Sequence, residues 1–229
     1  MSQHYKEAFP TLVSYNRFLE LIPLAIMPLL LLLGQVPGEK TGRYFIDSTK
    51  LPVCDNWRIG RHKVFEGFAK RGKTSTGWFF GFKLHLVIND KGELMHFKIT
   101  SGSTDDRSVV QTLTQGLKGW LFGDKGYLSK KLVQTLKASN IELITRLKRN
   151  MKKQFLDSIR KWWLNKRGGI ESVIDQLKAI LHLQHTRHRS VQNYFANITS
   201  ALLAYSLKPK KPSITFEKSI TKMMSLISS

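Results

Sequence analysis

Residues 78–100 constrain the fold of this 229-residue chain most strongly, because they are typical of a hairpin of two long strands. Along the first strand, apolar side chains alternate at Phe82, Leu84, Leu86 and Ile88. This alternation indicates a strand with one buried face. The tripeptide Asp90-Lys91-Gly92 is a turn signal, and an apolar segment at 94–100 follows it. The sequence therefore predicts an antiparallel opening to a β-sheet.

Strand and helix patterns alternate after this hairpin. Apolar residues recur at helical spacing over 106–117, 130–138, 169–183 and 191–207, and short apolar strands are predicted at 120–123 and 141–145. A further apolar run, 44–47, precedes the hairpin, and the basic segment 58–76 between them is predicted to be a loop or a long hairpin end. We therefore predict an α/β fold with a mixed sheet flanked by helices.

The charge of the chain narrows the class of partner. It carries 37 Lys and Arg residues against 16 Asp and Glu residues, which gives a formal net charge of +21. A folded domain of this charge accumulates polyanions, so nucleic acid is the leading partner class. Basic runs at 58–73, 146–167 and 208–222 would supply the binding surface, although each could also be a solvated loop. The single cysteine, Cys54, excludes a disulfide within the chain.

The segment 21–34 is strongly apolar and needs a separate explanation. It is interrupted by Pro23 and Pro28. A helix that spans a membrane needs about 20 apolar residues, and this run is shorter. We therefore expect a broken, buried helix that packs on the main domain, and no membrane partner. The first 20 residues do not show the pattern of a signal peptide.

Three acidic residues occupy positions at which side chains can meet. Asp47 ends the run 44–47, Asp124 follows the predicted strand 120–123, and Glu171 lies in the first turn of the helix 169–183. Side chains at the carboxyl ends of strands converge on one edge of an open α/β sheet. Clustered carboxylates repel one another unless cations neutralise them, and hard oxygen ligands suit Mg²⁺ or Mn²⁺. The pattern is consistent with two metal ions that catalyse phosphoryl transfer.

Each acid also has a structural explanation when it is taken singly. An acid at a strand end is common, and the helix dipole favours Glu in a first turn. Asp90 is explained by the hairpin turn, and Asp105 or Asp106 by a helix N-cap. Asp175, one helical turn after Glu171, stays open as an alternative third ligand.

Several separate motifs resemble the bacterial insertion-sequence transposases of the DDE class. The segment FIDSTKLPVC at 45–54 resembles the first-aspartate segment of that family, and GDKGY at 123–127 resembles its second. The segments RHKVFEGFAKRGK at 61–73 and GWFFGFKLH at 77–85 resemble the same group. Arg167, Glu171 and Lys178 match the spacing of its third-acid signature, whereas Leu164 stands where the family often has Tyr. The resemblance covers roughly 40–207.

The resemblance implies a ribonuclease-H-like fold and a metal-dependent DNA transposase. Its catalytic and metal-binding residues would be Asp47, Asp124 and Glu171. The cofactor would be Mg²⁺, with two ions bound, and Mn²⁺ could substitute for it. The partners would be DNA, both element ends and target, and further copies of the chain when it is active, with no small-molecule substrate. The chain would act in the bacterial cytoplasm, on the nucleoid. Residues 1–40 would be a helical remnant of a longer N-terminal region, 41–207 the catalytic domain and 208–229 a basic tail.

Positions i, i+4 and i+7 of a helix share one face, so Arg167 and Lys178 would hold phosphates on either side of Glu171. Gly168 and Gly169 could instead end the helix and place Arg167 in a loop. We also expect DNA contacts from Lys83, His85, Arg61, Lys63 and Lys125. Trp162 and Trp163 could stack on flipped bases, although core packing explains them equally well.

Two other functions stay open on the sequence alone. A non-catalytic nucleic-acid-binding protein would have the same basic surface, and replacing its three acids would leave its function intact. An inactive transposase remnant would fold and bind DNA but would not cut it.

Overall fold

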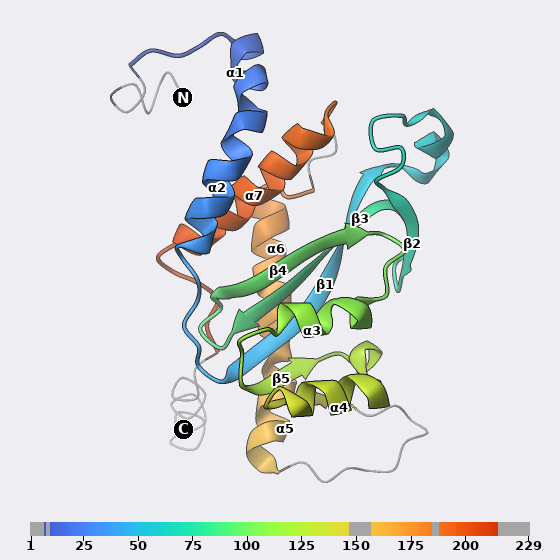
Figure 1. Ribbon diagram of the computed structural model, residues 1–229, viewed down its shortest axis with the longest axis vertical. Coiled ribbons are helices and arrows are strands. Elements are labelled where there is room, and N and C mark those ends of the chain that lie inside the picture. Colours follow the sequence, from blue (N-terminus) through green and yellow to red (C-terminus); the bar gives the residue numbers. More distant parts are fainter. Residues whose placement is uncertain (1–6, 8–9, 147–156, 185–187, 215–229) are drawn as a thin grey trace, which may run out of the picture.

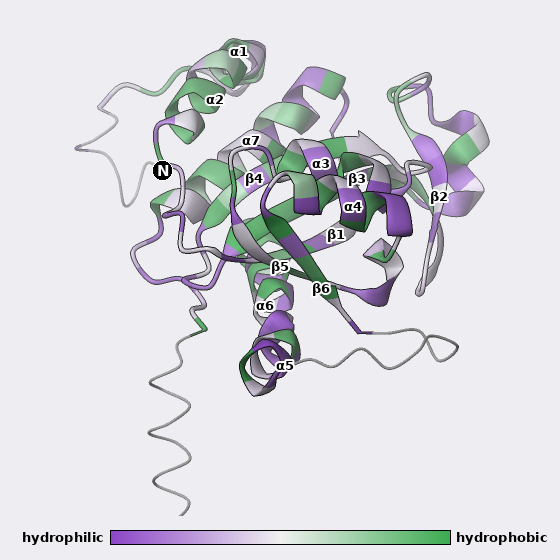
Figure 2. Ribbon diagram, turned by 60° about the horizontal axis from the view of Figure 1, so that its bottom comes forward, coloured by the Kyte–Doolittle hydropathy of each residue, from purple (hydrophilic) through white to green (hydrophobic). Residues whose placement is uncertain are grey.

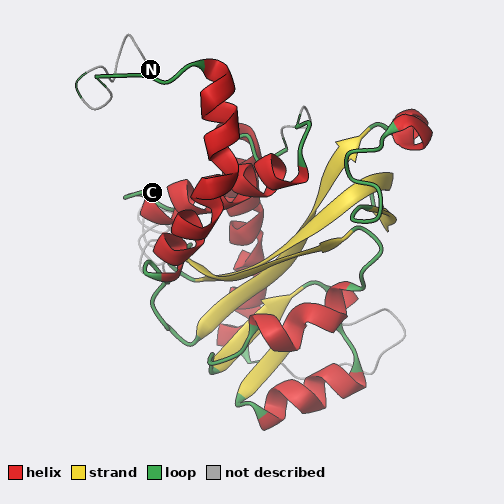
Figure 3. Cartoon of the chain, turned by 45° about the horizontal axis from the view of Figure 1, so that its top comes forward, coloured by secondary structure: helices red, strands yellow, loops and turns green. Residues whose placement is uncertain are grey.

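A computed structural model describes residues 7, 10–146, 157–184 and 188–214 of the chain. A six-stranded mixed sheet lies at its centre and helices cover both faces (Figures 1 and 3). The strands are β1 (Arg43–Cys54), β2 (Lys70–Thr74), β3 (Gly77–Asn89), β4 (Leu94–Ser101), β5 (Gly119–Gly123) and β6 (Ile141–Thr145). The α-helices are α1 (Tyr15–Leu21), α2 (Ile26–Gly34), α3 (Val110–Leu113), α4 (Lys130–Ala138), α5 (Ser158–Asn165), α6 (Gly169–Asp175) and α7 (Val191–Leu207).

Strand β1 organises the sheet. It pairs antiparallel with β3 along most of its length, and its first residues pair parallel with β5, which in turn pairs parallel with β6. The other side of β3 is shared between two strands, because β2 pairs with 77–81 and β4 pairs with 82–88. The outcome is the predicted α/β mixed sheet with an antiparallel opening and parallel strands after it.

Each face of the sheet carries its own apolar core. One core joins Phe45, Phe82 and Leu84 to side chains of α5, α6 and α7. The other joins Ile46 and Val87 to the shorter helices α3 and α4. Side chains that alternate along β1 and β3 therefore enter opposite cores, as the period of a strand requires. The sheet therefore lies between two apolar cores.

Several elements match their predicted bounds. The hairpin of β3 and β4, the helices α4 and α7, and the strand β6 all form where the sequence patterns indicate. The predicted helix 106–117 is shorter, because a 3₁₀ turn at Asp106–Val109 leads into α3, which ends at Leu113.

The predicted end of the first strand is wrong, and two basic segments contain regular structure. Strand β1 does not end at Asp47 but continues to Cys54, since β3 supplies hydrogen-bonding partners beyond that point. Of the two predictions for the basic segment 58–76, the hairpin end is confirmed for its last part, because Lys70–Thr74 forms β2 against β3. Part of the basic segment 146–167 forms α5, which reaches Asn165. Residues 147–156 of that segment lie outside the described residues.

The N-terminal segment is helical and packs on the main domain as predicted, with a 3₁₀ turn between its two α-helices, but most of it is not buried. Helix α1, a 3₁₀ turn at Ile22–Ala25 and α2 follow one another directly, and Leu33 is the buried residue of α2. Figure 2 shows this stretch largely in the hydrophobic colour, standing out from the main body, while α2 packs against α7. Within the described residues, Tyr15–Gly34 is one helical stretch long and apolar enough to cross a membrane by length and composition.

Candidate active site

Strand pairing brings Asp47 and Asp124 to the same level of the sheet. The parallel register of β1 and β5 pairs Phe45 with Phe122, and each aspartate follows its phenylalanine by two residues. Asp47 lies within β1, whereas Asp124 lies just after β5 and begins a 3₁₀ turn at Lys125–Tyr127. Each carboxylate accepts a hydrogen bond from the next backbone amide, Ser48 N at 2.8 Å and Lys125 N at 2.7 Å.

A helix that crosses this face of the sheet contributes Glu171 and Arg167. Helix α5, a 3₁₀ turn at Lys166–Gly168 and α6 are continuous, and both Gly168 and Gly169 have helical backbone angles. The glycines therefore do not break the helix, and Arg167 lies in the 3₁₀ turn that directly precedes α6. Its guanidinium Nη1 lies 3.5 Å from Asp124 Oδ1.

The charges of Asp124, Arg167 and Glu171 act on the carboxyl of Asp47. Burial raises the pKa of the Asp47 carboxyl to about 6. The carboxylates of Glu171 and Asp124 contribute to this rise in pKa, whereas the Ser48 amide and Arg167 oppose it. Negative charges thus converge here without full compensation, which is unfavourable unless a cation is close.

The donor set of this site fits a hard divalent cation. Its oxygens belong to carboxylates, the ligands that Mg²⁺ and Mn²⁺ prefer. Asp124 and Glu171 both raise the pKa of Asp47, so a positive charge placed between these acids would be stabilised. In the described part of the chain, however, no group of three or more His, Cys, Asp or Glu side chains is already close enough to hold a metal ion together.

Lys178 also faces this region, from a π-helical turn at Gln176–Ile180 that continues α6. Burial and the neighbouring Lys50 lower the pKa of the Lys178 ammonium, while Asp175 and Asp47 act in the opposite direction. Glu171 is among the charges that act on Asp47, whereas Asp175 acts on Lys178. This arrangement favours Glu171 over Asp175 as the third acid.

A fourth acid, Asp106, was not predicted to belong to the site. Its carboxylate accepts hydrogen bonds from Ser48 Oγ at 2.9 Å and from Lys83 Nζ at 2.8 Å. The sequence left Asp105 and Asp106 as equal N-cap candidates. Asp105 is the N-cap, because its side chain accepts the Arg107 amide. Asp106 is therefore free to reach the residue next to Asp47, and the sequence did not indicate this contact because the two residues lie 58 positions apart.

His85 does not have the role that was predicted for it. Its side chain is fully buried, and Nε2 lies 2.8 Å from Thr100 Oγ1, so in this structure it has no surface to offer to DNA. Lys83, two residues before His85 on β3, has its ammonium engaged by Asp106 and by the Thr104 carbonyl. The prediction of a DNA contact is thus corrected for His85.

The remaining basic candidates are placed differently. Arg61, Lys63 and Lys125 are exposed, and Lys125 directly follows Asp124. Trp163 is buried against Phe45, so core packing explains it and base stacking does not.

A cleft of about 650 Å³ opens beside Asp47 and Asp124. Its other lining residues come from β2, from the start of β3 and from the loop after β4, and they include Arg71, Lys73, Trp78, Lys83 and Asp106. Four of the lining side chains are cations (Arg71, Lys73, Lys83 and Arg107), and two lining acids are paired with them, Asp106 with Lys83 and Asp105 with Arg107. The cleft thus joins the acids to a basic strand.

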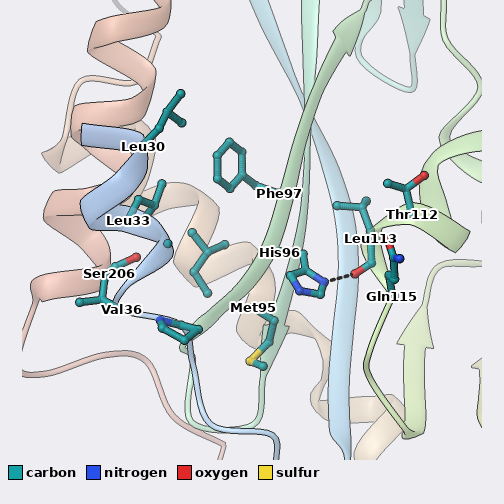
Figure 4. A pocket seen from close by; sticks show the side chains of 13 residues that line it. Leu30, Leu33, Val36, Met95, His96, Phe97, Thr112, Leu113, Gln115 and Ser206 are labelled. Carbon is teal, nitrogen blue, oxygen red and sulfur yellow. Dashed lines mark hydrogen bonds between the residues drawn. The ribbon is translucent and has the colours of Figure 1, made fainter. Parts of the chain in front are cut away.

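A second hollow, of about 520 Å³, lies between α2, β4 and α3 (Figure 4). Leu33, Val36 and Phe97 line it, and His96 Nδ1 lies 2.6 Å from the Leu113 carbonyl at its edge. No acidic residue lines this hollow, whereas Asp47 and Asp124 both line the first cleft.

Comparisons with known proteins address the identity of this site. A family model described as a transposase DDE domain matches residues 37–191. No curated protein sequence matches the chain at a significant level. Among solved structures, a piggyBac transposase in a synaptic complex with hairpin DNA, determined by cryo-electron microscopy, is similar with a TM-score of 0.46 and 11% identity. The match covers 83% of this chain and 53% of that one, so the chain spans about half the length of that transposase.

Proposed function

Because this chain belongs to the transposase DDE domain family, we propose that it catalyses metal-dependent cleavage and strand transfer of DNA for an insertion element. The observation that carries this proposal is that the carboxylates of Asp124 and Glu171 both act on the buried carboxyl of Asp47. The two other acids raise the pKa of Asp47, although the three residues lie far apart in the sequence. The residues that match the family model, 37–191, include all three acids.

Each residue of the site has a role in this proposal. Asp47, Asp124 and Glu171 would hold two Mg²⁺ ions, and Mn²⁺ could replace Mg²⁺. When bound, such ions activate a water or a 3′-hydroxyl and stabilise the leaving oxygen of a phosphodiester. Arg167 already lies 3.5 Å from Asp124, so its guanidinium can hold the phosphate that is cut. Lys178 adds a second cation on the same helix.

The partners follow from the same proposal. The net charge of +21 and the basic strand along the cleft favour the phosphate backbone of DNA. Element ends and target DNA would be the substrates. Further copies of the chain would assemble with it on paired element ends. The proposed place of action is the cytoplasm, on the nucleoid.

Nicking of supercoiled plasmid in Mn²⁺ tests the proposal. Asp47→Asn, Asp124→Asn and Glu171→Gln should each abolish nicking, because each substitution removes a charged oxygen ligand. The matched control is Asp175→Asn, which removes an exposed acid from the same helix as Glu171. This variant should nick as the unmodified chain does.

Other outcomes would replace the proposal. Nicking that survives in Glu171→Gln but is lost in Asp175→Asn would move the third ligand to Asp175. No nicking by the unmodified chain, with salt-sensitive DNA binding retained, would favour an inactive remnant or a non-catalytic DNA-binding protein.

A further inference from the structure

The tip of the β2–β3 hairpin presents an exposed aromatic ring beside a cation. Lys73 and Trp78 are direct cross-strand partners, so their side chains share one face of the hairpin. The Trp78 side chain is 60% exposed, and the Lys73 ammonium lies 5.5 Å from the centroid of its ring. The backbone below the ring is held in place, because Asn56 Nδ2 donates a hydrogen bond to the Trp78 carbonyl at 3.0 Å. The ring is therefore positioned but uncovered.

This ring and the acidic residues face one space. Trp78, Lys73 and Arg71 line the cleft of about 650 Å³ that Asp47 and Asp124 also line. A polymer bound at the acids would therefore run past the hairpin tip.

The charge around the ring indicates which polymer this would be. Strand β2 has the sequence KRGKT and contains no acid. Among the described residues, Arg71 and Lys73 take part in none of the ion pairs, whereas Lys83 and Arg107 of the same cleft are paired with Asp106 and Asp105. Unpaired cations beside an exposed aromatic ring form the surface that single-stranded nucleic acid uses, with phosphates on the cations and a base on the ring.

We propose that Trp78, flanked by Lys73 and Arg71, is a stacking platform for an unpaired nucleobase of the DNA strand that is held at the acids. The proposal rests on the proposed function and adds the form of DNA that the site takes. Inside a duplex each base is stacked on its neighbours, so the indole can stack only on a base that has left the helix or lies in a single strand.

The chain offers a matched control in Trp57. Its side chain is 73% exposed, and the Arg58 guanidinium lies 5.2 Å from its ring centroid, so its chemistry resembles that of Trp78. Trp57 does not line the cleft. Differences between the two positions therefore report on placement and not on the loss of a surface tryptophan.

The test measures binding of two short DNA duplexes in EDTA, where no cleavage takes place. Both contain 2-aminopurine, paired in one duplex and in a single-base bulge in the other. The unmodified chain should bind the bulged duplex more tightly and quench its fluorescence. Trp78→Ala should lose this preference and the quenching, weakening bulged-duplex binding by roughly 5- to 150-fold. Trp78→Phe should keep most of both, and Trp57→Ala should keep all.

Binding of the paired duplex should be unchanged in Trp78→Ala, because no charge is removed. The inference is overturned if the unmodified chain does not prefer the bulged duplex, or if Trp78→Ala keeps that preference and the quenching. It is also overturned if Trp57→Ala loses them equally. A chain that binds neither duplex would refute the proposed function as well, whereas the first outcomes leave nicking and the triad untouched.

Discussion

Replacing His85 with glutamine should make the loss of stability that this protein shows on acidification smaller. Burial lowers the pKa of the His85 imidazole from 6.5 to about 4. Asp106 opposes this lowering of the pKa, whereas Lys83 and Lys98 contribute to it. The imidazole is thus neutral in the folded protein at pH 5, whereas it takes up a proton in the unfolded chain.

The sign and size of the effect follow from this difference. Between the two pKa values the unfolded state binds more protons, so stability is complete above pH 6.5 and is lost as the pH falls toward 4. Between pH 7 and pH 5 the loss from this one group is about 2 kcal/mol. Glutamine does not titrate, and its amide can replace the contact of Nε2 with Thr100 Oγ1.

Urea unfolding at pH 7 and pH 5, followed by tryptophan fluorescence, measures this contribution. The free energy of unfolding of the unmodified chain should fall by about 2 kcal/mol more than that of His85→Gln over this interval. Groups that titrate in both proteins cancel in the comparison. Equal losses in the two proteins would refute the reasoning and would mean that His85 titrates normally in the fold.

Two further predictions test the site and the N-terminal helix. Asp106→Ala removes the acceptor for both Ser48 Oγ and Lys83 Nζ and should lower the free energy of urea unfolding by about 1.5–3 kcal/mol; an unchanged value would contradict these contacts. Leu31 is 65% exposed, so Leu31→Glu should change the free energy of unfolding by less than about 0.5 kcal/mol and should reduce aggregation. Leu33 is 8% exposed, so the control Leu33→Ala should lower the free energy of unfolding by about 2–5 kcal/mol in the same thermal or urea melts. Equal costs at the two leucines would show that the outer face of the helix is packed.

Elements with a strong local pattern could be predicted from the sequence. Strand β3 alternates apolar and polar residues, α4 and α7 repeat at helical spacing, and the turn at Gly92 has the positive φ of 74° that glycine tolerates. Elements that depend on a distant partner could not. Strand β2 is a basic, glycine-containing segment that is extended because β3 pairs with it, and its own side chains do not predict a strand.

The N-terminal helix shows the same limit. Its apolar composition predicts burial, because apolar side chains are stabilised when they leave water. Leu24 is nevertheless 71% exposed and Leu31 is 65% exposed. Burial needs a facing surface, and the sequence of a segment does not show whether the fold provides one.

For the candidate site, the sequence by itself determined the identities of the acids, through the motifs around Asp47, Asp124 and Glu171 and their resemblance to a family. Their meeting was decided by the tertiary structure. The register of β1 against β5 aligns the two aspartates, and the helix that continues across Gly168 brings Arg167 to Asp124. The same structure buried His85 and brought Asp106 to Ser48. The physical reason is that a side chain's chemistry is a property of its residue, whereas its neighbours depend on strand register and helix packing between segments far apart in the chain.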